Sequence, residues 1–523
     1  MFVSSGISRS DLHLKGRKMV RRDGKQVLLI ASGECVFALA NRCPHEGYPL
    51  SEGTLAPDCL LTCNWHNWKF DLRTGEAVVG RDPVRTYPVE LRGEEIFFDL
   101  TDPPAEAQRD CALKGLEGAV ADNDLARMAR ELARLERAGF DARDGFARAI
   151  AARNERLENG MTHAHAAAAD WLLLAERAST PELRLAAMLE PVAHLADDSL
   201  GGGNFPYAEG RAEWDPAAFV AAVEAEDETN AVAMVRGALT HGLTYNEMRP
   251  AFGEAALEHY ADFGHCAIYT LKTGQLIARL DGQAAEPLLL ALTRMLIRAT
   301  REERLPEFRF YAKALSAWDG DGSQPVREND FIGASIDGGL KRTLASSGRD
   351  SREIYDALLG AAAWNLLHFD RAFEQATGGT LADNISWLDF THALTFANAC
   401  RHICEERSEL WPRALLQMAL FVGRNRKYAD PEQDVARFRV NDRESFLARE
   451  MAALYDHGVP EPIIACHRVK VLCALEDELA AAPDAPWGDA MCAAVNRYLN
   501  TPMKRHHGLR TASQALDFIV REA

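Results

Sequence analysis

The chain has 523 residues, of which 47% are hydrophobic, and this length is too great for one ordinary domain. Its formal net charge of −18 argues against nucleic acid or an anionic membrane as a partner. The opening residues, MFVSSGISRSDLHLKGRK, lack the apolar stretch of a signal peptide, and no run of 18 apolar residues occurs. We therefore expect a cytoplasmic protein in which most of the 11 cysteines remain reduced thiols.

Residues 1–103 carry the pattern of a small antiparallel β domain. Short β-branched and aromatic runs, such as 27–30, 36–39 and 96–98, lie between turns that contain glycine. The pattern becomes helical after the segment TDPPAEAQRD, so we expect residues 104–120 to form a linker.

Two cysteines and two histidines lie in paired positions within this first domain. The sequence CPH, with Cys43 and His45, is followed 17 residues later by CNWH, with Cys63 and His66. Two thiolates and two imidazoles suit either zinc or an iron–sulfur cluster, so the ligand types leave both open. The spacing favours the cluster, because a zinc ribbon usually takes two cysteines from one turn, whereas here each loop pairs one cysteine with one histidine.

With these residues the first domain resembles the Rieske-type [2Fe-2S] ferredoxins. The run HNWKFDLRTGE that starts at His66 is similar to the H-G-W-x-F-D-x-x-T-G run of that family. Two positions depart from the family pattern, since Asn64 replaces a proline and Asn67 replaces a glycine. Asparagine tolerates the left-handed conformation, so we expect the turn to persist. The resemblance implies a [2Fe-2S] cluster with four ligands, Cys43, His45, Cys63 and His66.

The residues around this motif also indicate a subtype. The respiratory-complex subtype joins its two cluster loops by a disulfide, at positions that Tyr48 and Trp65 occupy here. It also places serine and tyrosine hydroxyls near the cluster sulfurs, where this chain has Trp68 and Phe70. Because those hydrogen-bond donors are missing, we expect a reduction potential near the low end of the Rieske range, roughly −150 mV.

Residues 121–523 are expected to form an all-α domain. Leu125, Met128, Leu132 and Leu135 fall on one helical face, and Pro287 suits a first helical turn. No glycine-rich nucleotide motif follows a strand, so we expect a separate reductase, or ferredoxin reductase, as the electron donor. Further helices are expected at 161–177, 353–375, 386–406, 411–422, 444–456 and 466–481.

An electron carrier fused to a helical domain suggests a second redox centre there. Asp262 with His265 and Asp389 with His392 are each three residues apart, so on a helix each pair could offer a carboxylate and an imidazole to one ion. Chance alone produces about two such pairs in this composition, so the spacing by itself decides nothing. Two interpretations stay open: an iron site, or buried histidines hydrogen-bonded to aspartates.

The surroundings of the two pairs are alike. Each Asp is preceded by an aromatic residue two positions earlier and followed by phenylalanine, and each His is followed four residues later by an aromatic residue. This similarity suggests an internal duplication, with halves at about 121–320 and 330–523. The positions concerned are Tyr260, Phe263 and Tyr269 in the first half and Trp387, Phe390 and Phe396 in the second.

The helical region resembles the questin-oxidase-like proteins, which cleave a ring of anthraquinones oxidatively. The resemblance lies in THAHAAAADWLL, DFGHCAIYTLKTGQLI, DFTHALTFANACRH and IIACHRVKVLCAL. It places His165, His265, His392 and His467 at the recurring histidine positions. The α/β catalytic domain of the Rieske oxygenases fits badly, because Ala256 stands where that family has an aspartate.

The sequence therefore predicts a two-domain redox protein, an oxygenase that oxidises a small organic, possibly aromatic, substrate in its helical domain. An oligomer could place the cluster of one chain beside the pocket of its neighbour. Two alternatives stay open, in which the chain is only an electron carrier or is a redox sensor with a docking domain.

Overall fold

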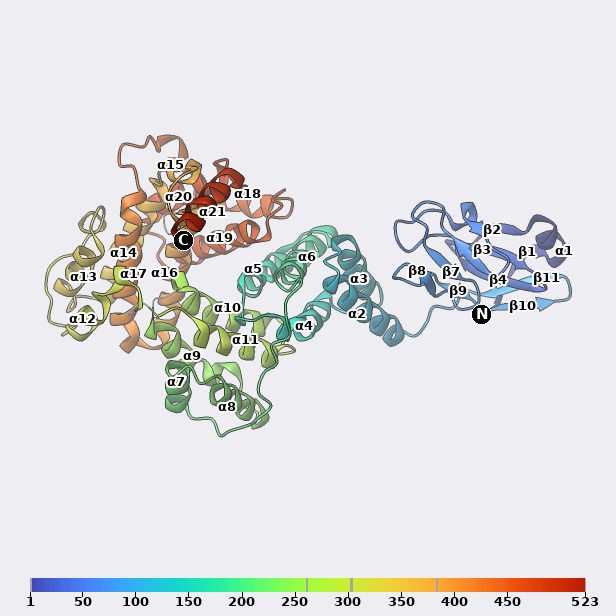
Figure 1. Ribbon diagram of the computed structural model, residues 1–523, viewed down its shortest axis with the longest axis horizontal. Coiled ribbons are helices and arrows are strands. Elements are labelled where there is room, and N and C mark those ends of the chain that lie inside the picture. Colours follow the sequence, from blue (N-terminus) through green and yellow to red (C-terminus); the bar gives the residue numbers. More distant parts are fainter. Residues whose placement is uncertain (1, 260–261, 302–303, 382–383, 523) are drawn as a thin grey trace. The chain divides into compact units, whose positions relative to one another are not determined.

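The computed structural model describes residues 2–259, 262–301, 304–381 and 384–522 (Figure 1). The chain divides into two compact units, Met1–Cys111 and Ala112–Ala523. Strands form most of the first unit and helices the second, which confirms the fold class expected from the sequence.

The first unit is a small antiparallel β domain. Within the described residues its strands pair in the orders β1-β11-β10, β2-β3-β4-β9 and β5-β6-β7-β8. The runs expected at 27–30, 36–39 and 96–98 lie in β3, β4 and β11. The elements are β1 (Phe2–Ser8), α1 (Arg9–Lys15), β2 (Arg17–Arg22), β3 (Lys25–Ser32), β4 (Cys35–Ala40), β5 (Thr54–Leu55), β6 (Leu60–Thr62), β7 (Lys69–Asp71), β8 (Ala77–Val79), β9 (Thr86–Tyr87), β10 (Val89–Arg92) and β11 (Glu95–Asp99).

Strand β3 separates two small hydrophobic cores because its side chains alternate between its faces. Leu28 and Ile30 pack in the same core as Phe70 of β7, whereas Leu29 packs in the other core with Phe98 of β11. The core around Phe70 also contains the two candidate cysteine ligands. Burial of this core therefore fixes the loops that carry them.

Two helical segments differ from the expectation. Residues 105–121 form helix α2 (Ala105–Ala121) where we expected a linker, because Ala112, Leu116 and Ala119 recur at helical spacing and are buried. The single helix expected at 353–375 is divided, because Asp370 caps a new helix through a hydrogen bond from Ala372 N (2.8 Å).

The second unit contains one continuous hydrophobic core that extends from Ala112 to Tyr498. The two halves expected at about 121–320 and 330–523 therefore share a single interior. Its longer helices are α3 (Leu125–Arg137), α4 (Ala142–Arg153), α5 (His163–Arg177), α6 (Pro181–Asp198), α7 (Pro216–Glu224), α8 (Glu228–Thr240), α9 (Tyr245–Glu258), α10 (His265–Arg279), α11 (Ala285–Arg298), α12 (Tyr311–Ser316), α13 (Ile336–Ala345), α14 (Ser351–Leu367), α15 (Arg371–Gln375), α16 (Trp387–Glu406), α17 (Trp411–Asn425), α18 (Arg443–Leu454), α19 (Pro462–Ala481), α20 (Gly488–Asn500) and α21 (Gly508–Glu522).

Helices α5, α10, α16 and α19 form a bundle in the middle of this unit, in which α10 packs on α5 and α16, and α19 packs on both α16 and α5. Contacts at two levels show that α5 and α10 run in the same direction. His163 and His265 meet at the first residues of the two helices, with 3.2 Å between their Nε2 atoms. Seven residues later on each helix, Lys272 Nζ donates to Asp170 Oδ1 at 2.6 Å.

The other pair of helices in the bundle is also parallel. Thr391 Oγ1 of α16 lies 3.1 Å from His467 Nδ1 of α19, and further along both helices Asn398 Nδ2 donates to Glu478 Oε1 at 2.8 Å. Helices α5 and α19 are likewise joined at both levels, by the rings of His163 and His467 and by the Arg177–Glu476 ion pair. The N-terminal ends of all four helices therefore meet.

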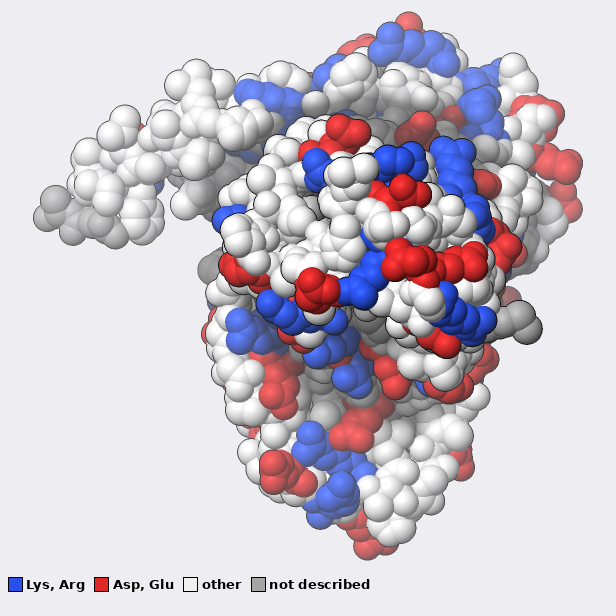
Figure 2. All heavy atoms as spheres, turned by 90° about the vertical axis from the view of Figure 1, so that its right-hand side faces the viewer, with Lys and Arg blue, Asp and Glu red and all other residues white. Residues whose placement is uncertain are grey.

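Among the residues that the structure describes, no helix combines the length and the apolar character needed to cross a membrane. Over the face drawn in Figure 2, basic and acidic side chains are interspersed.

Candidate metal centres

The two cysteines of the first unit lie at the start of two turns of similar shape. In the first turn Cys43 N donates to Tyr48 O (2.9 Å) and Gly47 N donates to Cys43 O (2.8 Å). The second turn repeats this, since Cys63 N donates to Trp68 O and Asn67 N donates to Cys63 O. Asn67 has a φ of 60°, so it adopts the left-handed conformation that we expected it to tolerate.

The four candidate ligands are arranged as a sulfur pair inside the domain and a nitrogen pair at its surface. Cys43 and Cys63 are buried, whereas the imidazoles of His45 and His66 are partly exposed. Their Nδ1 atoms are 3.1 Å apart and the rings meet at 78°. Both imidazoles can thus point Nδ1 at one metal ion while both sulfurs face another.

The electrostatics of the cysteines fit metal-bound thiolates. Burial raises the pKa of the Cys43 thiol to about 11, and the neighbouring Cys63 adds to this rise, while the backbone N–H of His45 opposes it. A thiolate here needs a compensating positive charge, which bound iron provides. The residues therefore fit a [2Fe-2S] cluster.

Aromatic rings cover the histidine pair. Trp68 stacks on His45 with 4.8 Å between ring centroids, and Trp65 stacks on His66 at 4.9 Å. A side chain at Gly80 would lie 2.5 Å from the Trp68 ring, so this glycine allows the ring to pack flat. Trp65 is 56% exposed and forms the outer edge of the site.

Comparison with known proteins agrees with this geometry. The family model of the Rieske [2Fe-2S] domain matches residues 7–88. The chain is 37% identical over 78 residues to the 3-phenylpropionate/cinnamic acid dioxygenase ferredoxin subunit of Shigella boydii serotype 4 (strain Sb227), which covers 14% of this chain and 74% of that protein. The chain belongs to the Rieske [2Fe-2S] domain family. The Rieske domain accordingly carries a [2Fe-2S] cluster, which confirms the resemblance seen in the sequence.

The same subunit from Escherichia coli (strain K12) is also 37% identical over 78 residues, with the same coverage. Among solved structures, the ferredoxin of carbazole 1,9a-dioxygenase from Nocardioides aromaticivorans IC177 is 28% identical, with a TM-score of 0.18. It covers 19% of this chain and 99% of that chain. These relatives describe the Rieske domain and leave most of the helical unit unmatched.

Four histidines meet inside the helical unit, one from each helix of the bundle. His265 Nε2 lies 2.8 Å from Nε2 of His392 and 3.2 Å from Nε2 of His163. His163, His392 and His467 also offer ring nitrogens that lie within 4.8 Å of one another. Neighbouring ligands of one metal ion, each about 2.1 Å from it, are about 3 Å apart, so this spacing fits a single cation. We call these four residues the histidine quartet.

His265, His392 and His467 are buried and His163 is partly buried. Three of the four histidines are held in the neutral form that binds metals. Burial lowers the pKa of His163, His392 and His467 well below the ordinary value, and nearby Lys470 lowers it further. These three imidazoles are therefore neutral at pH 7, as metal ligands must be. Thr391 Oγ1 fixes the His467 ring through Nδ1, so that Nε2 of this ring is directed elsewhere.

A left-handed turn brings α10 against α16 at the quartet. Gly264, just before His265, has a φ of 75°, and a Cβ there would lie 2.4 Å from the Phe396 ring of α16. Phe263 also has a positive φ of 54°, and its ring stacks on His392. The backbone at this point therefore depends on glycine for the approach that joins His265 to His392.

The structure places the expected aspartates differently from the histidines. Asp389 Oδ2 accepts a hydrogen bond from Ser386 N (2.9 Å) in a capping box, and Oδ1 accepts one from Arg424 (3.2 Å). This carboxylate therefore caps α16 rather than sharing an ion with His392. The side chain of Asp262 and the whole of Tyr260 lie outside the described residues.

His165 also lies apart from the quartet, although the sequence placed it at a recurring histidine position. Its Nδ1 accepts a hydrogen bond from Thr162 N (3.2 Å) in the capping box of α5. His163 takes part in the quartet instead, because it is the first residue of α5 and projects from the helix end. Threonine three residues before His165 was the signal for a cap.

Sequence reasoning did not single out the buried ionisable groups below the quartet. Lys272 and Asp170 form an ion pair of 2.6 Å with both side chains almost fully buried. Lys470, three residues after His467, is completely buried, and its Nζ has no nitrogen or oxygen hydrogen-bond partner among the described residues. Burial raises the pKa of Asp170 and lowers that of Lys470.

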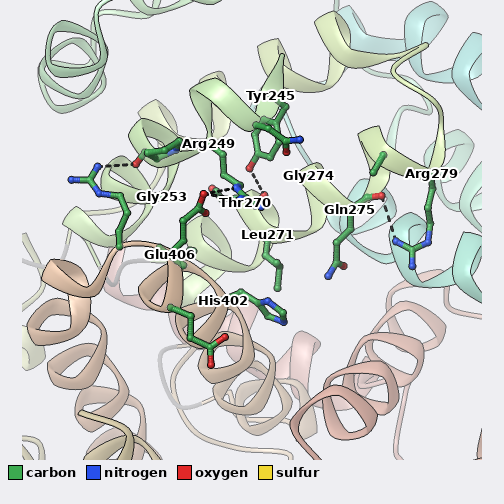
Figure 3. Close-up of a pocket in the computed structure, with 16 residues that line it drawn as sticks. Tyr245, Arg249, Gly253, Thr270, Leu271, Gly274, Gln275, Arg279, His402 and Glu406 are labelled. Carbon is green, nitrogen blue, oxygen red and sulfur yellow. Dashed lines mark hydrogen bonds and ion pairs between the residues drawn. The ribbon is translucent and has the colours of Figure 1, made fainter. Parts of the chain in front are cut away.

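A cavity of about 530 Å³ opens between α9, α10 and α16. Along α10 its wall extends from Thr270 to Arg279. Figure 3 shows Thr270, Leu271 and Gln275 on one wall and His402 and Glu406 on another. Arg249 donates to Glu406 across it at 2.6 Å. Several polar side chains thus lie in the cavity wall, and one of them, Gln275, contacts the buried Lys272.

Proposed function

We propose that the chain is an oxidoreductase whose helical unit holds an iron ion in the histidine quartet and oxidises a small aromatic substrate with dioxygen. The observation that carries this proposal is the meeting of four imidazoles, three of them buried and that of His163 partly buried, one from each helix of a parallel bundle. When bound, the [2Fe-2S] cluster supplies electrons one at a time, and an external reductase replenishes them.

The hydrogen-bonding capacity of imidazole supports a cation in the quartet. A neutral imidazole carries only one N–H. His265 Nε2 approaches the Nε2 atoms of both His163 and His392, so one proton on it can satisfy only one of these two contacts. The remaining lone pairs repel one another unless a cation lies between them. A metal ion satisfies all of them together.

The type of donor supports iron rather than zinc. Imidazole suits zinc, copper, iron and nickel alike. Single electrons from a Rieske domain are useful only to an acceptor that changes its oxidation state, which zinc does not do. Four nitrogen ligands also leave positions free on a six-coordinate ion, where dioxygen and substrate can bind.

The residues around the quartet support an apolar substrate. The rings of Phe263 and Tyr269 lie beside His392 and His265. The relatives named above belong, by their names, to dioxygenases of 3-phenylpropionate, cinnamic acid and carbazole. We extend that aromatic class to this chain.

Metal analysis of the full-length protein, purified without added zinc, tests the proposal. We expect about three irons per chain, two in the cluster and one in the quartet. The variants His265→Ala and His392→Ala should lose one iron and keep the rhombic resonance of the reduced cluster. His506→Ala, which alters an exposed histidine, is the control and should keep all three.

If the wild-type protein contains only two irons and neither variant changes that number, the oxidoreductase proposal is wrong. The chain would then be an electron carrier or a redox sensor. The substrate class is tested separately, by screening 3-phenylpropionate, cinnamate and carbazole for substrate-dependent oxygen uptake in the presence of a ferredoxin reductase.

A further inference from the structure

The buried ion pair between α5 and α10 has no part in holding the metal. Asp170 and Lys272 each follow a quartet histidine by seven residues, which is about 10 Å along a helix. Burying two charges is costly, and apolar residues of similar volume often stabilise a protein as well or better. The pair therefore calls for a role other than stability.

The inner end of this pair leads toward the quartet. Asp170 Oδ1 accepts from Lys272, while its Oδ2 has no hydrogen-bond partner among the described residues. The buried Nζ of Lys470, which interacts with the Cys466 thiol, is electrostatically coupled both to Asp170 and Lys272 and to His163, His392 and His467. Lys470 is therefore near enough to the ion pair and to the quartet to connect them.

The outer end of the pair leads to the cavity. Lys272 Nζ also donates to Gln275 Oε1 at 3.2 Å, and Gln275 lines the cavity wall (Figure 3). A continuous series of polar groups therefore extends from the cavity into the bundle. Other ionisable groups within electrostatic range of the series are Arg177, Arg279, Cys466, Cys473 and Glu476.

We propose that Gln275, Lys272, Asp170 and Lys470 form a path that carries protons from the cavity to the histidine quartet. This inference rests on the proposed function, because hydroxylation of a substrate RH follows RH + O2 + 2 e− + 2 H+ → ROH + H2O. The electrons come from the external reductase through the Rieske domain, and because His265, His392 and His467 are buried, protons need a path to them from the protein surface. Burial raises the pKa of Asp170 above its ordinary value, which favours uptake of a proton by this carboxylate and so supports the path.

The test uses the full-length protein with cobalt(II) in the quartet, since the visible absorption of cobalt responds when its exchangeable ligand gains or loses a proton. The absorbance is followed after a stopped-flow pH jump. The same jump is repeated on protein without cobalt, and this signal, which comes from the cluster, is subtracted. In Asp170→Asn/Lys272→Met we expect the same cobalt content and equilibrium spectrum, but a relaxation slowed about tenfold or more. This double variant removes both charges, so that no unpaired charge remains buried.

Two further variants make the test specific. Glu228→Gln/Arg294→Met neutralises a comparable ion pair between α8 and α11 and should relax at the wild-type rate. Gln275→Leu removes the contact between the cavity wall and Lys272 but leaves the buried ion pair intact, so it remains informative if the double variant fails to fold, and it should slow the relaxation severalfold. Relaxation at the wild-type rate in the variants of the path, with cobalt bound, would overturn the path and leave the metal site standing. Failure of the wild-type protein to bind cobalt would instead remove the proposed function, and the path with it.

Discussion

The Rieske domain and the helical unit use histidine in opposite ways. His45 and His66 are 21 residues apart, and both are partly exposed at the end of their loops. Three of the four quartet histidines are buried, and the two contacts of His265 join residues 102 and 127 positions apart. This comparison shows that residues close together in the sequence can form a surface site for exchanging electrons with a partner. A site that excludes water needs a whole helical bundle around it.

The effect of pH on the metal-free protein should separate the two units most strongly. The quartet histidines His163, His392 and His467 have pKa values below 6.5 when folded, so below pH 6.5 the unfolded chain binds protons that the folded helical unit does not. The contribution of these three histidines to the free energy of unfolding is therefore greatest above pH 6.5. It should fall by up to about 4 kcal/mol per pH unit as the pH drops toward 5.

Urea unfolding of the metal-free protein at a series of pH values checks this slope. His467→Gln should reduce it by about 1.4 kcal/mol per pH unit, because one such group is removed. His506→Gln should leave it unchanged. An equal slope in the wild-type protein and His467→Gln would contradict the prediction.

A substitution before α10 should disturb the quartet and spare the Rieske domain. Gly264→Ala places a Cβ against Phe396 at a positive φ, so we expect a loss of about 2–3 kcal/mol in the stability of the helical unit. Metal bound at the quartet should fall with it, while the cluster spectrum stays the same. Gly282→Ala is a matched control, because its φ of 77° is equally positive but nothing lies within 4 Å of the added Cβ.

Thermal unfolding and metal analysis of both variants measure this difference. Equal losses in Gly264→Ala and Gly282→Ala would show that the contact with Phe396 is unimportant.

The smallest expected effect concerns the Rieske domain alone. Phe70→Tyr adds a hydroxyl in the core that contains both cysteines, so a new hydrogen bond to a sulfur should stabilise the reduced cluster. A hydrogen bond of about 1 kcal/mol raises a one-electron potential by about 40 mV from the expected value near −150 mV. Phe98→Tyr, in the other core, should leave the potential unchanged.

A redox titration of the intact protein measures both potentials. A clearly positive midpoint in the wild-type protein would contradict the subtype assigned from Trp68 and Phe70.

How much the sequence could predict differs between the two units for the same reason. The candidate cluster ligands lie on two short loops, so residue spacing alone indicated Cys43, His45, Cys63 and His66. The effect of having Asn67 in place of the family's glycine could also be predicted, because the φ angle that a residue tolerates is a local property. Local patterns therefore sufficed to predict the fold of the Rieske domain and its [2Fe-2S] cofactor.

The quartet depends on packing between distant helices, which no local pattern encodes. The sequence indicated His265, His392 and His467 but placed His165 where the structure has His163, because the exact start of α5 decides which histidine projects into the bundle. The role of Asp389 was readable, since Ser386 three residues earlier forms a capping box with it.

The parallel arrangement of α5, α10, α16 and α19 has a consequence for how the protein matures. A long segment of chain separates each of these helices from the next one in the sequence, so the contacts of the quartet have a high contact order. On the ribosome, a chain shorter than 467 residues lacks the last histidine of the quartet. Loading of the proposed metal should therefore be a late event that follows collapse of the whole helical unit, whereas the Rieske loops emerge early and are complete within the first 66 residues.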